Sequence, residues 1–135
     1  MPVLKRLPAT RIVAAPAALD EVVWPEEALV LRLAPDEVLV MPPLGSVPVG
    51  DPHAIIIAEG GFAGVWLTAA EALTFLERAC EWEIPNERPA FAQGAVAGIA
   101  TKIWLEEERV LFVVPAPYGH DVEERVGVIG ILPEV

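Results

Sequence analysis

The clearest hydrophobic pattern in the chain is a helical repeat that follows Thr68. Apolar residues recur there at spacings of three and four, which places them on one face of an α-helix over about residues 69–81. They are Ala69, Ala72, Leu73, Leu76, Ala79 and Cys80. The start of the helix is marked by a capping box, in which Thr68 and Glu71 each satisfy the other's backbone amide. Pro85 excludes helical geometry at the residue before it, so the helix ends earlier.

Runs of β-branched and other apolar residues predict strands on both sides of this helix. The predicted strands cover residues 28–33, 37–41, 54–59, 62–67, 95–105 and 110–114. The first two flank the turn sequence at 34–37 and predict a hairpin. Because 54–58 is an uninterrupted aliphatic run, we expect the strand at 54–59 to be buried on both faces. Period-two alternation predicts one long strand over 95–105, which an acidic turn connects to the last strand.

These elements predict an α+β fold, with an antiparallel or mixed sheet covered by two helices. The second helix is expected to begin at Asp121, with Val122 and Val126 one turn apart. Residues 1–27 show no sustained periodicity and include four prolines, which predicts an irregular N-terminal arm anchored by Trp24. A single domain is then expected over residues 28–131, followed by a tail at 132–135.

Residues 32–43 weakly repeat in residues 104–115, with leucine, valine, leucine and proline at matching positions. Both segments are predicted to form a hairpin that ends in proline. An ancestral duplication and chance agreement in a valine- and proline-rich chain explain this similarity equally well.

Charge and composition narrow the class of protein. The 135 residues include 20 acidic and 9 basic side chains, and the net charge of -11 repels nucleic acid and anionic lipid. No apolar run approaches the ~20 residues of a membrane helix, so we expect a cytoplasmic protein without membrane contact. The lone Cys80 lies on the apolar helix face, where packing explains it. Scarce amides and an excess of arginine over lysine suggest a thermophile or a high-GC genome.

Few residues in the sequence suggest a catalytic, metal-binding or phosphate-binding role. Glu59 follows a predicted buried strand and would suit proton transfer, although a carboxylate at a strand end explains it as well. His53 and His120 lack the spacing of metal ligands, and a local hydrogen bond at the helix end explains Glu83 as well as a functional role does. Glycines at 60, 61 and 64 suggest a phosphate cradle, yet neither a lysine nor a helix follows them. We therefore assign no catalytic residue and no metal ligand.

Tryptophans offer the best candidates for contact with other proteins. Trp66 and Trp104 occupy strand positions that alternation can place on an outer face, where aromatic side chains anchor protein contacts. We therefore select Trp24, Trp66 and Trp104 as candidate interface residues. Packing in the core is the alternative for each of them.

The order of signals from residue 31 to 126 resembles the gamma subunit of heterotetrameric sarcosine oxidase. It resembles more distantly the folate-binding domain of glycine-cleavage aminomethyltransferases, whose α+β fold has ferredoxin-like elements. The resemblance is carried by order and spacing rather than by any one motif. Its carriers are the segments 32–40, 53–57, 65–72, 75–76, 90–94 and 113–115.

The resemblance implies a non-catalytic accessory subunit of a flavin-dependent amine oxidoreductase, with larger flavoprotein subunits as partners. In aminomethyltransferases an acidic residue on the long strand faces the folate, but residues 100–104 contain no carboxylate, so we expect no catalytic activity from the chain alone. Tetrahydrofolate or flavin would then be held only through partner subunits. Two alternatives stay open: a stand-alone folate or one-carbon binding protein, and a self-assembling structural or regulatory module.

Overall fold

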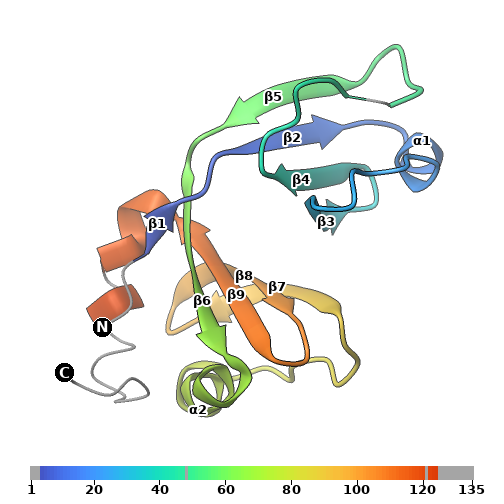
Figure 1. Cartoon of the computed structure of the whole chain (residues 1–135). Coiled ribbons are helices and arrows are strands. Elements are labelled where there is room, and N and C mark those ends of the chain that lie inside the picture. The colour runs from blue at the N-terminus through green and yellow to red at the C-terminus, as the bar shows by residue number, and fades with distance from the viewer. Residues whose placement is uncertain (1–3, 48, 121, 125–135) are drawn as a thin grey trace. The chain divides into compact units, whose positions relative to one another are not determined.

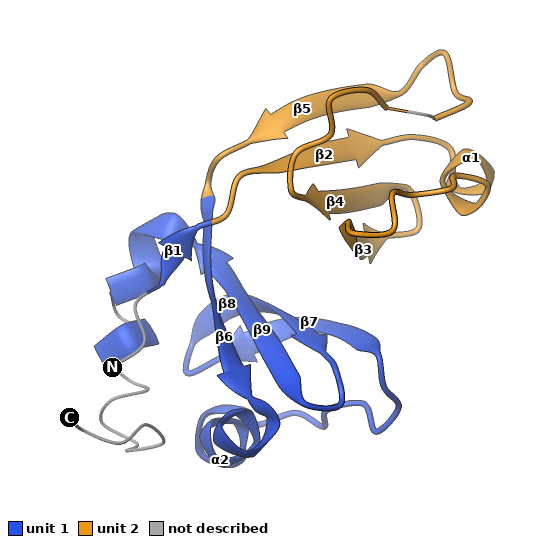
Figure 2. Cartoon of the chain, viewed as in Figure 1, with its two compact units in different colours: residues 1–6, 62–135 blue, residues 7–61 orange. Residues whose placement is uncertain are grey.

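The computed structural model describes residues 4–47, 49–120 and 122–124, and it is an α+β structure with two antiparallel sheets (Figure 1). The predicted α+β class is confirmed, although the strands form two sheets where we expected one. The chain divides into two compact units: unit 1 contains Met1–Arg6 and Phe62–Val135, and unit 2 contains Leu7–Gly61 (Figure 2). We therefore describe each unit by itself.

The described part of the chain contains strands and short helices in the following order. They are β1 (Lys5–Arg6), β2 (Ala9–Val13), α1 (Pro16–Asp20), β3 (Leu29–Ala34), β4 (Glu37–Met41), β5 (Ile55–Glu59), β6 (Phe62–Thr68), α2 (Ala69–Ala79), β7 (Ala90–Val96), β8 (Ile99–Leu105), β9 (Arg109–Pro115) and the 3₁₀-helix η1 (Ala116–Tyr118).

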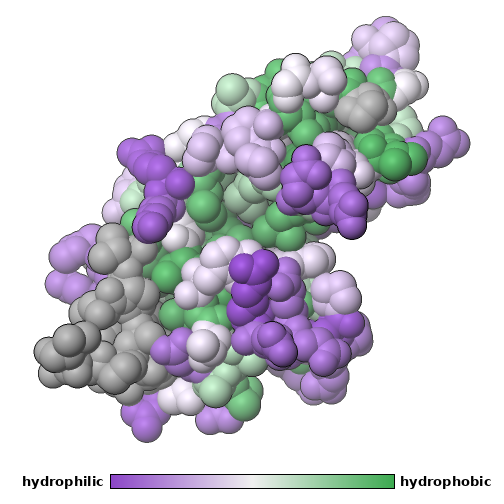
Figure 3. Space-filling view, viewed as in Figure 1, coloured by the Kyte–Doolittle hydropathy of each residue, from purple (hydrophilic) through white to green (hydrophobic). Residues whose placement is uncertain are grey.

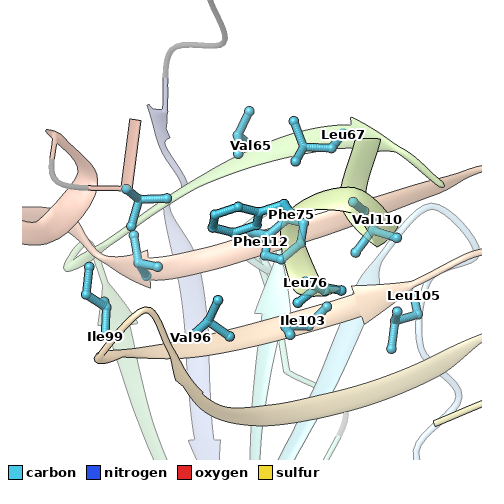
Figure 4. Close-up of a cluster of buried hydrophobic side chains, with 13 residues drawn as sticks. Val65, Leu67, Phe75, Leu76, Val96, Ile99, Ile103, Leu105, Val110 and Phe112 are labelled. Carbon is cyan, nitrogen blue, oxygen red and sulfur yellow. The ribbon is translucent and has the colours of Figure 1, made fainter. Parts of the chain in front are cut away.

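Unit 1 is a five-stranded sheet, in the order β1-β6-β9-β8-β7, with α2 packed on one face. Alternate residues of β6, β8 and β9 point toward the helix and form the core shown in Figure 4. Phe75 of α2 meets Phe112 of β9 edge to face, with the ring centroids 5.6 Å apart. Burial of these aliphatic and aromatic side chains is the main force that holds the helix to the sheet.

The predicted start of α2 is confirmed. The Glu71 amide donates to Thr68 Oγ1 at 3.2 Å, and the Thr68 amide donates to Glu71 Oε1 at 2.9 Å. The predicted buried face was wrong at one position, because Leu73 is 60% exposed and Phe75 is buried instead. Residues 72, 75, 76 and 79 share one face at helical spacing, whereas residue 73 is rotated about 100° away from residue 72.

The long strand predicted over residues 95–105 is instead a hairpin. β7 and β8 pair antiparallel, and the turn between them is formed by Ala97 and Gly98, both with positive φ (51° and 78°). Two consecutive positive φ values are typical of the tight turns that join twisted antiparallel strands. The alternation predicted for the second half is confirmed, since Ile99, Thr101 and Ile103 are all buried.

Unit 2 is a four-stranded sheet in the order β3-β4-β2-β5. The predicted hairpin at 28–41 is confirmed as β3 and β4. One face of the sheet packs on α1 and on the loop that follows β4. Its buried core residues are Ile12, Ala14, Leu19, Val38 and Val40, and Trp24 is among the partly buried residues that pack against them.

The irregular arm predicted over residues 1–27 is not what the structure contains. β1 and β2 belong to two different sheets, and α1 follows directly after β2. These elements are only two to five residues long and lie between prolines, so none of them spans enough residues to establish a period.

The prediction that residues 54–59 are buried on both faces was wrong. β5 is a strand, but Ile55, Ile56 and Ile57 are 55%, 50% and 47% exposed. β5 lies at the edge of its sheet, with only β2 beside it. An uninterrupted aliphatic run carries no alternation, so it cannot distinguish a central strand from an exposed edge.

The predicted last helix falls partly outside the described residues, since Asp121 and Val126 are not among them. Residues 119, 120 and 122–124 are helical, and Val122 is buried against the core of unit 1. Both segments of the weak repeat form antiparallel hairpins, β3 with β4 and β8 with β9. An ancestral duplication stays a prediction.

Candidate interaction surface

The sheet of unit 1 carries a row of large side chains on its outer face, the face that points away from α2. The neighbours of Trp66 on either side lie in the core, so Trp66 points to the outer face. The strand register places Trp66 opposite Leu111, Leu111 opposite Trp104, and Trp104 opposite Phe91. The row therefore crosses four strands, and it places two of the predicted interface residues on one face.

Arg109 covers the ring of Trp66. It lies two residues before Leu111 on β9, so its side chain rises from the same face. Its guanidinium carbon is 3.7 Å from the centroid of the Trp66 ring, which is the geometry of a cation–π stack. The Arg109 side chain is 54% exposed and Trp66 is 37% exposed, so the stack faces solvent.

Glu106 joins this stack to Trp104. Its Oε1 accepts a hydrogen bond from Arg109 Nε at 2.8 Å, and its Oε2 accepts one from Trp104 Nε1 at 2.9 Å. The turn that brings them together is closed by the Glu106 amide, which donates to the Arg109 carbonyl at 2.9 Å. We call these four residues (Trp66, Trp104, Glu106 and Arg109) the Trp66 cluster.

The electrostatics of the Trp66 cluster favour an ionised carboxylate. The hydrogen bond from Arg109 lowers the pKa of Glu106 below its usual value, and the indole of Trp104 and the charge of Arg109 lower it further, against the opposing effect of partial burial. Glu106 is therefore a fixed acceptor at neutral pH rather than a proton donor. The cluster is suited to binding, since its groups hold one another in place.

A second cation–aromatic pair lies on the same face. Lys102 of β8 places Nζ 4.9 Å from the centroid of the Phe62 ring of β6. Cationic groups are therefore gathered over aromatic rings here, in a chain whose net charge is -11.

The third predicted interface residue, Trp24, lies in unit 2. It is half-buried and packs against the core of that unit. The structure thus brings Trp66 and Trp104 together and assigns Trp24 a packing contact in a different unit.

Glu59 is engaged in an ion-pair network of unit 2. Arg11 of β2 reaches Glu37 Oε2 with Nη1 at 3.0 Å and Glu59 Oε1 with Nη2 at 3.1 Å. The other oxygen of Glu59 accepts a hydrogen bond from the Gly61 amide. Both carboxylate oxygens therefore have partners, which favours the interpretation of Glu59 as a strand-end residue over a role in proton transfer.

The glycines predicted as a possible phosphate cradle have other surroundings. The Gly61 amide is directed at the Glu59 carboxylate, a negative group that opposes a phosphate. Gly64 lies within β6, paired with Val113. These positions serve the strand and its turn.

His53 and His120 take part in separate polar contacts. The His53 amide donates to Asp51, and His120 Nε2 lies 3.3 Å from Glu124 Oε1, one helical turn away. Within residues 4–47, 49–120 and 122–124, no group of three or more histidine, cysteine, aspartate or glutamate side chains is placed to hold a metal ion. Glu83 is exposed in the loop after α2.

Cys80 caps the end of α2 and packs against the unit 1 core, as predicted. Its Sγ donates to the Trp82 carbonyl at 3.3 Å. A cavity of about 10 Å³ lies inside this unit and is lined mainly by apolar residues. That volume corresponds to a single water molecule at most, so the cavity is too small for a folate or a flavin.

Glu106 and Arg109, the two charged residues of the Trp66 cluster, were not selected from the sequence. The signal was present, since Trp104 and Glu106 share a strand face at period two and Arg109 follows across the tight turn. Their meeting with Trp66 depends on the pairing of β6 with β9, which no local pattern specifies.

The sequence matches no model of a known protein family, and it matches none of the curated proteins with which it was compared. Among the helices in the described part of the chain, none combines the length and the apolar character needed to span a membrane.

Proposed function

We propose that this chain is a non-catalytic accessory subunit that binds larger protein subunits through the Trp66 cluster. The observation that carries the proposal is the exposed stack of Arg109 on Trp66, in which an ion pair with Glu106 holds the guanidinium in place. Tryptophan and arginine are the residues most enriched at the energetic centres of protein interfaces. A side chain already held in one conformation also loses less entropy when a partner covers it.

Our proposal for the partner rests on the resemblance of residues 31–126 to the gamma subunit of heterotetrameric sarcosine oxidase. We propose larger flavoprotein subunits of an amine oxidoreductase as partners, and a domain fold related to the folate-binding aminomethyltransferases. Flavin or tetrahydrofolate is then a ligand of those partners. Calorimetry of the isolated chain with tetrahydrofolate is expected to give no binding heat, and a measurable heat would favour the stand-alone folate-binding alternative.

The experiment that tests the proposal is recovery of the tagged chain from its native host. We expect larger subunits with the visible absorbance of flavin to be retained. The Trp66→Ala and Arg109→Ala variants should retain less of them, because each variant removes one half of the stack. Leu73→Ala is the matched control, since Leu73 is 60% exposed but lies on α2, on the other side of the sheet.

Two results would count against the proposal. One is a wild-type chain that is recovered alone at its physiological concentration. The other is retention of the flavoprotein subunits by both variants at the level of the Leu73→Ala control, which would place the contact elsewhere.

A further inference from the structure

The edges of the two sheets differ in how they are protected against pairing with another strand. Natural sheets protect an edge with a short strand, a bulge, a charge or a covering side chain. β1 has only two residues, and β3 has a register shift between Arg32 and Ala34. At the edge of β7, the Trp82 indole donates to the Ala95 carbonyl at 2.7 Å. Three of the four edges therefore carry such a device.

β5 lacks the devices of the other three edges, and its one charged residue, Glu59, is paired with Arg11 of the neighbouring strand β2. Its five residues pair with β2 in an unbroken register, and they include no proline and no lysine. Ile55, Ile56 and Ile57 are about half exposed, so apolar side chains stand on both faces of the strand. Figure 3 shows hydrophobic residues among polar ones at the surface in the upper part of the view, where Figure 1 draws β5 and the loop that precedes it. An edge of this kind is a template for another strand.

The register identifies which backbone groups of β5 point outward. The Ala14 amide donates to the Asp36 carbonyl at 3.0 Å, so even-numbered residues of β2 bond toward β4 and odd-numbered ones toward β5. The partners of the odd-numbered residues on β5 are residues 55, 57 and 59. The N–H and C=O groups of Ile56 and Ala58 therefore point to the outer edge.

We propose that β5 pairs antiparallel with β5 of a second copy of this chain, across a two-fold axis at Ile57. In that register Ile56 lies opposite Ala58 of the second copy, and each such pair exchanges both of its N–H···O bonds. The two Ile57 side chains face each other at the axis, where strands of a pair approach most closely. The result is one continuous sheet through both copies.

The local charges of β5 do not oppose a second copy as the occupant. Glu59 is the one charged residue of β5, and it is paired with Arg11 at 3.1 Å within its own copy. The two-fold register places Glu59 opposite Ile55 of the other copy, so no like charges oppose one another. A two-fold contact must use one patch twice, and this strand is complementary to itself.

The interface is small, so we expect a weak dimer that forms with rising concentration. β5 belongs to unit 2 and the Trp66 cluster to unit 1, so self-pairing goes beyond the proposed function and can be tested without any partner subunit. Raising the ionic strength should favour the dimer, because salt screens the repulsion between two chains of charge -11.

Sedimentation of the full chain across a concentration series tests the proposal. We expect a monomer–dimer equilibrium, and Ile57→Lys should raise its dissociation constant roughly a hundredfold, because two like charges then face each other at the axis. Leu73→Lys is the matched control, since it places the same charge on an exposed leucine of unit 1. Circular dichroism shows whether each variant keeps the wild-type fold.

Cysteine cross-linking tests the register, in a Cys80→Ser background. Ile57→Cys should form a disulfide dimer on oxidation, since Cα atoms in a directly opposed pair of this kind are about 4.5 Å apart. Ile56→Cys should not, because residues two positions out of register lie roughly 7–8 Å apart. A monomer at every concentration, a dimer unchanged by Ile57→Lys, or stronger cross-linking through residue 56 would overturn the proposal. A strand from another protein, found on β5 in place of the second copy, would overturn it too.

Discussion

The indole ring of Trp82 lies against Gly94 of β7 and leaves no space for a side chain there. A methyl group at position 94 would lie 2.7 Å from Cε2 of Trp82, well inside van der Waals contact. The same indole is held by its hydrogen bond to the Ala95 carbonyl, so the ring cannot move aside without losing that bond. Trp82 thus ties the loop after α2 to the edge of the sheet.

Gly94→Ala is expected to lower the free energy of unfolding by about 1–3 kcal/mol, because the methyl group and the indole cannot occupy the same space. Urea denaturation measures the change. Gly45→Ala is the control, since a methyl group there meets no atom within 4 Å. In a Trp82→Ala background the cost of Gly94→Ala should largely disappear. An equal cost in both backgrounds would contradict the role of the indole.

Thr68→Ala is expected to destabilise unit 1 by about 1 kcal/mol, because the helix loses the side chain that caps the Glu71 amide. Thermal unfolding followed by circular dichroism measures the effect. Thr74→Ala serves as the comparison, since Thr74 is an exposed interior residue of the same helix and alanine is the better helix former. Equal losses in the two variants would argue against the capping box.

Glu106 should make stability depend on pH. Its pKa is lowered in the folded chain from 4.5, so its stabilising effect is fully present above that value and is lost as the pH falls through the folded pKa. Glu106→Gln should therefore reduce the free energy of unfolding at neutral pH. The gap between variant and wild type should close in acid.

Glu107→Gln is the control for that pH series, because Glu107 is an exposed residue of the same acidic turn. Denaturant unfolding at a series of pH values gives the comparison. A gap for Glu106→Gln that stays constant down to the most acidic pH would show that the carboxylate charge does not stabilise the fold. Asp51, whose pKa the amides of Ala15 and His53 lower, adds to the slope in every variant.

Ala97→Gly is expected to raise stability by about 1 kcal/mol. Ala97 has φ of 51°, a left-handed conformation that costs a residue with a Cβ about that amount. The amide of residue 97 keeps its bond to the Ala79 carbonyl in either case. Gly98→Ala should lower stability by a similar amount, since φ there is 78°. Calorimetric unfolding of the two variants should move in opposite directions, and a shared direction would contradict this account of the turn.

Local periodicity predicted the helices and strands that bury only one of their faces. α2 has a capping box and an apolar stripe, and residues 99–105 alternate cleanly, so these features were visible before any tertiary contact was known. Leu73 was misplaced because leucine is apolar on either face of a helix. The hairpin at Ala97 and Gly98 was missed because alanine is not a residue that signals a left-handed turn.

Tertiary pairing determined the features that could not be predicted. Residues 54–58 have the composition of a central strand, and only the absence of a second neighbour in the described sheet makes β5 an edge. Likewise, Trp66 could be placed on an outer face by alternation, but its contact with Arg109 comes from the pairing of β6 with β9. The sequence could thus identify individual candidate binding residues, but it could not show that they form a cluster.

The strand pair β1–β6 makes unit 2 an insert within the chain of unit 1. Arg6 lies opposite Ala63, and the chain leaves unit 1 after Arg6 and returns to it at Phe62. Antiparallel neighbours need only a tight turn to connect them, so the 55 residues of Leu7–Gly61 occupy the position of a hairpin loop. All strand pairings of the unit 1 sheet are therefore made by residues outside that 55-residue segment.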